Sequence, residues 1–277
     1  MIPFTKAHAC GNDFLVVTEE AAAGHDWAQL TVRLCARNTG VGADGIEFFA
    51  WLNKTVAGTK SGRIRLHNAD GSIAEISGNG TRCVAAWMAE QLGSEPGDEF
   101  EIVTDAGPRV CRIMNVRRGD EFSVEVRMGM GVPQFAPRMV RLSSGEEISG
   151  TEISTGNPHF VIAVDNEVFT VRGRPWTEIG AEICTHADFP NQTNVEFVRI
   201  VDRQTIEIRI FERGVGPTTS SGTGTSATST AALALYGCSS PLKVIAPGGA
   251  QSVEWGGAGS ELFLTGPATL VARGKAW

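Results

Sequence analysis

The feature that most constrains the fold of this chain is an internal repeat. Ser77–Thr81 reads SGNGT, and Ser221–Thr225, 144 residues further along the 277-residue chain, reads SGTGT. At the same offset, Ile64–Leu66 (IRL) falls on Ile208–Ile210 (IRI). Several collinear matches at one offset of about half the chain length predict two copies of a single domain.

A further pair of matches marks an early strand in each copy. Gly11-Asn12 falls on Gly156-Asn157 at an offset of 145. Each pair precedes a short apolar run that is typical of a β-strand, Phe14–Val17 in one copy and Phe160–Val164 in the other.

The boundary between the copies is predicted from local composition. The segment 129–137 is rich in glycine and proline, which interrupt periodic structure. We therefore predict an N-terminal domain of residues 1–130 and a C-terminal domain of residues 131–277.

Each copy has the same order of secondary-structure patterns. Period-2 alternation comes first, as at Ile206–Ile210, and a glycine-rich turn follows. A helix pattern comes next, Arg82–Leu92 in one copy and Ser226–Tyr236 in the other; both are apolar or small on nearly every face, which indicates burial. We predict an α/β (α+β) fold of two pseudo-symmetric domains, each a mostly antiparallel sheet wrapped round a central helix.

Composition and charge exclude several classes of protein. The chain has 24 Lys plus Arg against 31 Asp plus Glu, a net charge of −7, and no basic cluster, which argues against nucleic acid as a partner. No apolar stretch approaches the roughly 20 residues that span a bilayer, and polar residues interrupt the N-terminus, so we predict a cytoplasmic protein without membrane contact. The six cysteines lack CxxC spacing and the five histidines lack HxxxH spacing, which predicts reduced thiols and no metal site.

The two glycine-rich turns predict an anion site in each copy. A helix N-terminus has backbone N–H groups without acceptors, and its dipole favours negative charge. Neither turn has the lysine of a phosphate-binding P-loop or a GxGxxG pattern, so a small carboxylate fits better, bound in the cleft between the two halves. Ser77 and Ser221 then take matching positions; the alternative is that each serine is only a helix N-cap.

The chain resembles the diaminopimelate epimerase family, which consists of amino-acid epimerases that work without pyridoxal phosphate. The resemblance rests on five segments in the family's order, namely KAHACGNDFLVV (6–17), VGADG (41–45), NADGSIAEISGNGTRC (68–83), GNPHFV (156–161) and ERGVGPTTSSGTG (212–224). It implies interconversion of LL- and meso-diaminopimelate for lysine biosynthesis, with two bases that invert the α-carbon. It also implies an amino-acid substrate with a distal carboxylate, no metal or organic cofactor, and a possible homodimer.

The resemblance assigns roles to residues of this chain. The two catalytic positions are Ser77 and Ser221, with His159 and Glu212 as supporting residues, and Asp44 is a further candidate. The residues assigned to substrate binding are Asn12, Asn68, Gly78, Asn79, Asn157, Asn194, Glu212, Arg213, Gly222 and Thr223. Among these, Arg213 with Asn68 and Asn194 is expected to hold the distal carboxylate, because arginine offers a bidentate fork.

Both catalytic positions carry serine where the family has cysteine. A serine hydroxyl is a much weaker acid than a thiol, and it acts as a base only when a neighbouring group activates it. Three interpretations remain open at this point. The serines are an engineered change that traps a substrate complex, or the chain is a natural relative with altered chemistry, or it is a non-enzymatic amino-acid binder.

Overall fold

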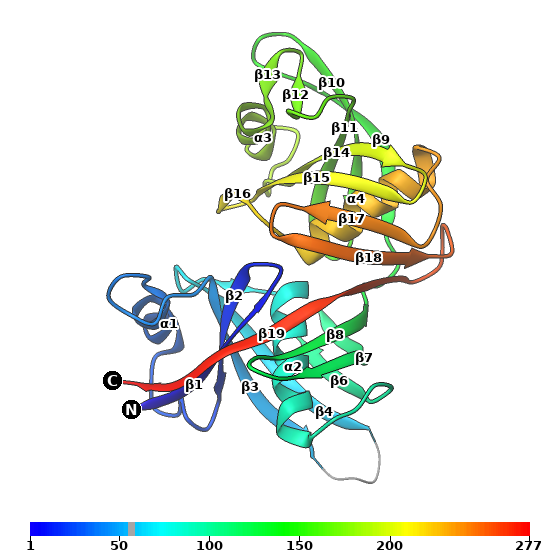
Figure 1. Cartoon of the computed structure of the whole chain (residues 1–277). Helices are drawn as coiled ribbons and strands as arrows, with labels where there is room; N and C mark the ends of the chain where they lie inside the picture. The colour runs from blue at the N-terminus through cyan, green and yellow to red at the C-terminus, as the bar shows by residue number, and fades with distance from the viewer. Residues whose placement is uncertain (55–58) are drawn as a thin grey trace. The chain divides into compact units, whose positions relative to one another are not determined.

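The computed structural model describes residues 1–54 and 59–277, which form two compact units. Unit 1 comprises Met1–Gly129 and Thr265–Trp277, and unit 2 comprises Met130–Leu264. Both consist mostly of β-strands with a few helices (Figure 1). None of the helices in the described ranges is both long and apolar enough to cross a membrane.

Unit 1 contains two helices and nine strands within its described residues. They are β1 (Ile2–Ala9), β2 (Asn12–Thr18), α1 (Trp27–Cys35), β3 (Gly45–Asn53), β4 (Lys60–Asn68), β5 (Ile73–Ala74), α2 (Gly78–Leu92), β6 (Glu99–Thr104), β7 (Gly107–Arg118), β8 (Phe122–Gly129) and most of β19 (Leu262–Ala276).

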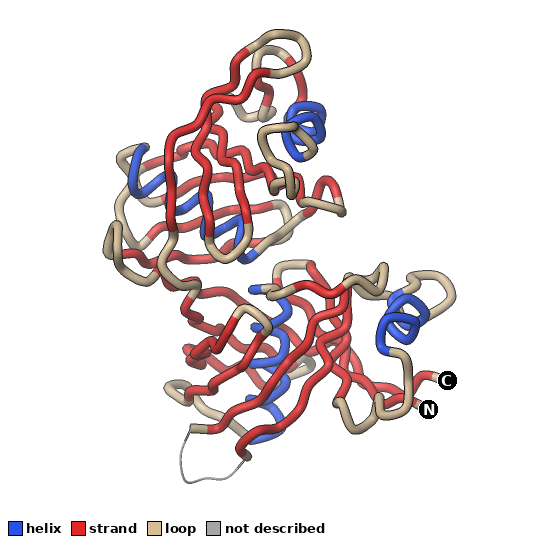
Figure 2. Tube along the Cα trace, turned by 180° about the vertical axis from the view of Figure 1, so that it is seen from behind, coloured by secondary structure: helices blue, strands red, loops and turns tan. Residues whose placement is uncertain are grey.

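The strands of unit 1 close on themselves round a helix. Antiparallel pairs join β1 to β2 and β19, β3 to β4, and β7 to β6 and β8, and parallel pairs join β2 to β3 and β4 to β6. A further pairing of β8 with β19 completes the ring. Helix α2 lies inside the ring. Of its ten residues from Cys83 to Leu92, only Glu90 is charged. Figure 2 shows the enclosed helix from behind.

Unit 2 repeats this arrangement. Its elements are β9 (Gln134–Arg141), β10 (Glu147–Ser154), β11 (Pro158–Val164), β12 (Thr170–Val171), β13 (Arg174–Pro175), α3 (Trp176–Cys184), β14 (Asn194–Asp202), β15 (Thr205–Glu212), β16 (Gly216–Thr218), α4 (Gly222–Leu235), β17 (Leu242–Ala246) and β18 (Gly249–Trp255). Antiparallel pairs again dominate, with parallel pairs of β11 with β14 and of β15 with β17. The predicted fold class is therefore confirmed.

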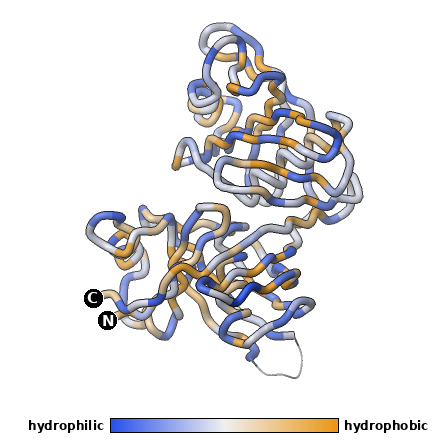
Figure 3. Tube along the Cα trace, viewed as in Figure 1, coloured by the Kyte–Doolittle hydropathy of each residue, from blue (hydrophilic) through white to orange (hydrophobic). Residues whose placement is uncertain are grey.

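Successive side chains of a strand point to opposite faces of the sheet, so neighbouring residues pack against different helices. In β3, Phe48 stacks on Trp27 of α1 with ring centroids 4.4 Å apart, whereas its neighbour Phe49 meets Trp87 of α2 at 4.8 Å. In unit 2, Phe197 of β14 packs against Trp176 of α3. Hydrophobic and hydrophilic segments accordingly alternate along the strands of both units (Figure 3). A polar residue on the face toward α2 or α4 is thus placed in the core of its unit.

The central helices begin earlier than the sequence patterns predict. They start at Gly78 and Gly222 rather than at Arg82 and Ser226, because the serine before each glycine is an N-cap that makes the glycine-rich turn the first helical turn. Helix α4 is rich in serine and threonine, and the buried hydroxyls of Ser226, Thr228 and Thr230 bond to carbonyls one turn earlier, as Ser226 Oγ does to Gly222 O at 2.9 Å.

The division of the chain differs from the prediction at its end. Residues 265–277 were predicted to belong to the C-terminal domain, but they lie in unit 1. The reason is strand pairing, since β19 runs antiparallel to β1 over seven registered residue pairs from Ile2 with Ala276 to His8 with Thr269. A linear boundary drawn from composition cannot detect a strand that returns to the first unit.

The enclosed helix of unit 1 predicts the effect of adding one methyl group at Gly80. A Cβ at this position would collide with the carboxyl group of Glu47 in β3. We expect Gly80→Ala to lower the free energy of unfolding by about 1–3 kcal/mol, as overpacking does, in chemical denaturation. Gly119→Ala is the matched control, because a Cβ at that exposed glycine meets nothing within 4 Å. Helix propensity alone predicts that Gly80→Ala raises the free energy of unfolding. Such an increase would contradict the close contact between Gly80 and Glu47.

Candidate functional site

In each unit, the ends of three strands meet the N-terminus of the central helix. In unit 1, β2 begins at Asn12, β3 begins at Gly45 and β4 ends at Asn68, and the register aligns Phe14, Gly45 and Asn68. Asp44 N donates to Asp13 O at 2.8 Å, and Ala69 N donates to Asp44 O at 2.9 Å. The candidate residues Asn12, Asp44 and Asn68 are therefore brought to one edge of the sheet.

Unit 2 assembles the equivalent edge from β11, β14 and β15. The register aligns His159 with Asn194 and Val195 with Phe211, so that Glu212 ends β15 beside the start of β14. Asn194 Oδ1 accepts from the backbone N–H of Arg213 at 2.9 Å. The side chain of Arg213 donates to Asn191 O at 3.0 Å and lies at the surface.

The two serines cap the two helices in the same way. Ser77 Oγ accepts from Gly80 N at 3.0 Å, and Ser221 Oγ accepts from Gly224 N at 3.2 Å. Ser221 Oγ also lies 3.4 Å from Thr223 Oγ1. Across the described residues, no carboxylate or imidazole lies within hydrogen-bond distance of either hydroxyl. Both serines are therefore N-caps in this structure, and neither is paired with a base.

An asparagine from the strand edge bonds to the first turn of each helix. Asn79 Nδ2 donates to Asn12 Oδ1 at 3.0 Å in unit 1. Asn157 Nδ2 donates to Thr223 Oγ1 at 3.4 Å in unit 2. Gly78 and Gly222, the first helical residues, add N–H groups that have no acceptor within a helix. Each unit thus presents a set of donors suited to a carboxylate.

An ion cluster borders the edge in unit 1. Arg37 donates to Asp13 Oδ1 at 2.9 Å and to Asp44 Oδ1 at 2.7 Å, and Lys6 Nζ lies 2.9 Å from Asp13 Oδ2. Burial works to raise the pKa of Asp13, but the bonds from Arg37 and Lys6 outweigh it and lower that pKa. The cluster holds the Asp13 carboxylate in its charged form and ties it, through Arg37, to Asp44 at the start of β3.

Sequence reasoning missed one buried glutamate under each helix N-terminus. Glu47 and Glu196 are the third residues of β3 and β14, on the face toward the central helix, and both are fully buried. A Cβ at Gly80 would strike Glu47, and one at Gly224 would lie 2.9 Å from Glu196 Oε1. The signal in the sequence was a single acidic residue inside an apolar strand.

The two glutamates differ in their partners. His159 is hydrogen-bonded through both ring nitrogens, since Nδ1 lies 2.7 Å from Glu196 Oε1 and Nε2 lies 2.9 Å from Asn157 Oδ1. Phe14 occupies the position of His159 in unit 1, and neither carboxyl oxygen of Glu47 has a hydrogen-bond partner. Burial, and secondarily the charge of Asp105, raises the pKa of Glu47 to about 8. Glu47 is therefore largely protonated at neutral pH.

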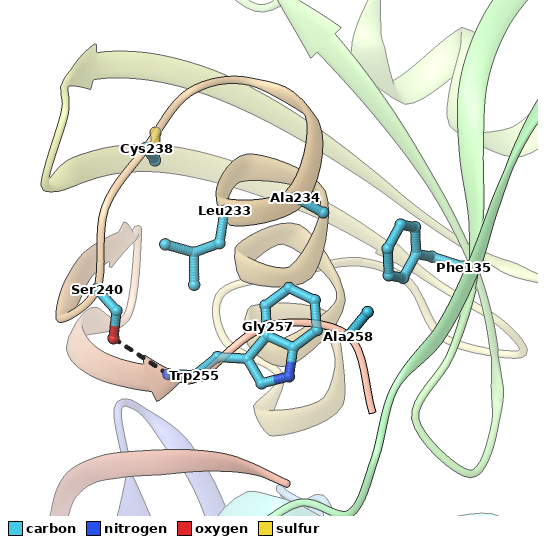
Figure 4. A pocket seen from close by; sticks show the side chains of 9 residues that line it. Phe135, Leu233, Ala234, Cys238, Ser240, Trp255, Gly257 and Ala258 are labelled. Carbon is cyan, nitrogen blue, oxygen red and sulfur yellow. Dashed lines mark hydrogen bonds between the residues drawn. The ribbon is translucent and has the colours of Figure 1, made fainter. Parts of the chain in front are cut away.

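A cavity of about 370 Å³ in unit 2 lies away from this edge (Figure 4). It is lined by Leu233 and Ala234 near the C-terminal end of α4, with Trp255 and Phe135. Ser240 Oγ accepts from Trp255 N at 3.1 Å, the bond drawn in Figure 4. None of the lining residues is charged. The cavity is thus separate from Ser221 and unsuited to a carboxylate.

Comparison with known proteins identifies relatives along the whole chain. A family model described as diaminopimelate epimerase matches residues 4–136 and 151–271. A diaminopimelate epimerase of Pseudomonas savastanoi pv. phaseolicola is 33% identical over 99% of both chains, and one of Corynebacterium glutamicum is 34% identical over 99% of this chain and 98% of its own.

Solved structures show the same fold at lower identity. A phenazine biosynthesis protein of the PhzF family from Bacillus anthracis superposes with a TM-score of 0.70 at 19% identity, covering 100% of this chain and 99% of its own. A hydroxyproline epimerase from Agrobacterium vitis, with bound trans-4-hydroxy-L-proline, superposes with a TM-score of 0.67 at 15% identity, covering 99% of this chain and 90% of its own.

The raised pKa of Glu47 predicts a pH-dependent stability. Between about pH 4.5 and about pH 8 the folded protein holds a proton on Glu47 that the unfolded chain has released. The free energy of unfolding therefore falls as pH rises through this window. We expect Glu47→Gln to remove this part of the decline in denaturation curves measured across the range. Glu121→Gln, at an exposed glutamate, is the control; a decline unchanged in Glu47→Gln would rule out the buried proton.

Proposed function

Because this chain belongs to the diaminopimelate epimerase family, we propose that it is an amino-acid epimerase that interconverts LL- and meso-diaminopimelate. In lysine biosynthesis this reaction inverts one α-carbon. Ser77 and Ser221 take the two acid–base positions, one hydroxyl from each unit. No cofactor takes part in the proposed mechanism.

The single observation that supports this proposal most strongly is the duplicated serine-capped helix N-terminus. Each unit combines one capping hydroxyl, the first N–H groups of a buried helix and an asparagine that bonds into the first turn. The helix dipoles favour the substrate α-carboxylate and the negative charge that develops when the α-proton leaves.

The proton moves in balance between the two serines. The deprotonated oxygen of one serine takes the α-proton, and the electron pair of the C–H bond remains on the α-carbon, delocalised into the carboxylate. The hydroxyl of the other serine then gives its proton to the opposite face and becomes the deprotonated partner. His159 and Glu212 support the two positions, with His159 held by Glu196.

Serine makes this reaction slow. Its hydroxyl is a weaker acid than a thiol, so its deprotonated fraction at neutral pH is much smaller. Neither hydroxyl is bonded to a base among the described residues, and each accepts a backbone N–H instead. The same observation favours a second candidate function, an amino-acid binder in which both serines act only as helix caps.

Proton exchange separates these two functions. We expect the protein to replace the α-proton of diaminopimelate with deuterium in D₂O, followed by NMR, faster than Ser77→Ala/Ser221→Ala. We expect Ser77→Cys/Ser221→Cys to exchange about 10²- to 10⁴-fold faster, the usual range for an effective acid–base group. Binding without exchange in the unaltered protein would support the binder. Absence of exchange in both the unaltered and the cysteine protein would overturn the proposed epimerase.

Arg213 provides a test of the distal carboxylate. We expect Arg213→Ala to weaken diaminopimelate binding roughly 10- to 100-fold, because a charge-assisted hydrogen bond contributes about 1.5–3 kcal/mol. Lysine lacks that carboxylate, so its binding should change little. Titration calorimetry with both ligands makes the comparison, with Arg203→Ala, an exposed arginine of unit 2, as the control. Equal losses for both ligands would exclude this role.

A further inference from the structure

A fully buried arginine, Arg82, stands in helix α2 without a counter-charge. Its side chain has no exposed surface, and it forms no ion pair with any residue in the ranges 1–54 and 59–277. Nη2 donates to Asn79 Oδ1 at 2.6 Å, whereas Nε and Nη1 have no partner. Burial of a cation in this manner is unfavourable, so a role beyond packing is indicated.

Two of the thiols around Arg82 do not supply the missing negative charge. Cys10, Cys83 and Cys111 lie close enough to act on it electrostatically. Burial raises the pKa of the Cys83 thiol far above its ordinary value and that of Cys111 to about 12. Both thiols are therefore neutral at physiological pH. Burial also lowers the pKa of Arg82, but a guanidinium is basic enough to keep its proton.

The fold itself does not require an arginine at this position. The repeat places Ser226 of α4 where α2 has Arg82. Ser226 is equally buried, and its hydroxyl is satisfied within the helix by Gly222 O. Unit 2 therefore builds the same enclosed helix with a small neutral side chain. The arginine is a property of the unit 1 site and not of the architecture.

Arg82 begins a directional series of hydrogen bonds that reaches the surface. Its Nη2 donates to Asn79 Oδ1, and Asn79 Nδ2 donates to Asn12 Oδ1 at 3.0 Å. Asn12 Nδ2 then donates to Asp44 Oδ2 at 2.6 Å. A guanidinium can only donate and a carboxylate can only accept, so the two ends fix the orientation of both amides between them.

We propose that Arg82 is a positioning residue for a carboxylate ligand at the N-terminus of α2. It occupies Asn79 Oδ1 as an acceptor, so that the carbonyl oxygens of Asn79 and Asn12 point back along the series and their NH₂ groups donate onward. Each NH₂ group has two hydrogens, and Asn12 uses one on Asp44. The orientation that the series imposes on Asn12 also directs the second hydrogen of this NH₂ group. The positive charge of Arg82 behind Asn79 favours an anion there. The identity of the ligand as an amino acid rests on the proposed function.

The test compares arginine with a second donor-only cation and with an apolar side chain. We expect Arg82→Met to weaken diaminopimelate binding at least tenfold and Arg82→Lys to stay within about threefold, because lysine also only donates. Ser226→Ala, the equivalent position in unit 2, is the control and should bind as the unaltered protein does. Titration calorimetry gives the affinities, and thermal unfolding shows that each variant is folded.

A second readout does not depend on diaminopimelate. In ¹H–¹⁵N spectra we expect acetate, a bare carboxylate probe, to shift the side-chain NH₂ signals of Asn12 in the unaltered protein and in Arg82→Lys but not in Arg82→Met. Asp44→Asn, at the other end of the series, should also lose this response, since an amide can accept or donate. It serves in place of Arg82→Met should that variant not fold.

The outcomes separate the two proposals. If acetate shifts the Asn12 NH₂ signals as expected but diaminopimelate does not bind, the role of Arg82 is supported and diaminopimelate is rejected as the substrate. Folded Arg82→Met that binds both ligands normally would overturn the role of Arg82, as would Arg82→Lys that fails as completely as Arg82→Met. Absence of an acetate response in the unaltered protein would also overturn it.

Discussion

Both units depend on the enclosure of one helix by a sheet. Because strands surround α2 and α4, the sides of these helices carry mostly apolar or small side chains, such as Ser226 with its bonded hydroxyl, and the buried Arg82 is the exception. Their N-termini are different, since the first N–H groups have no acceptors within the helix. The strand edges at Asn12 and Asn157 meet these N-termini. Enclosure thus confines the polar chemistry of each unit to one end of one helix.

Glycine in the first turn makes room for a second layer under that end. Gly80 and Gly224 leave space that the carboxyl groups of Glu47 and Glu196 occupy. A buried carboxyl group is costly unless it is protonated or paired, and the units use one solution each. Glu47 keeps its proton, whereas Glu196 is paired with His159. The same backbone therefore supports two differently partnered glutamates behind the two capping serines.

The repeat does not make the two units chemically equivalent. Arg82 has no counterpart in unit 2, and His159 has none in unit 1, where Phe14 takes its place. A scaffold of two like units supplies the two similar helix ends, and a few substitutions on strand faces and first turns make them distinct.

The sequence by itself determined the duplicated architecture, the central helices and the serines that cap them, because these follow from local rules of periodicity, glycine turns and N-caps. It placed the helix starts at Arg82 and Ser226, four residues late, since glycine has low helix propensity and only the cap geometry shows that the turn is helical. Only the tertiary structure decided that residues 265–277 return to unit 1, that Glu47 faces α2, and that Arg82 reaches Asp44 through two amides. These facts depend on pairing and packing between residues far apart in the chain, where no local pattern carries the information.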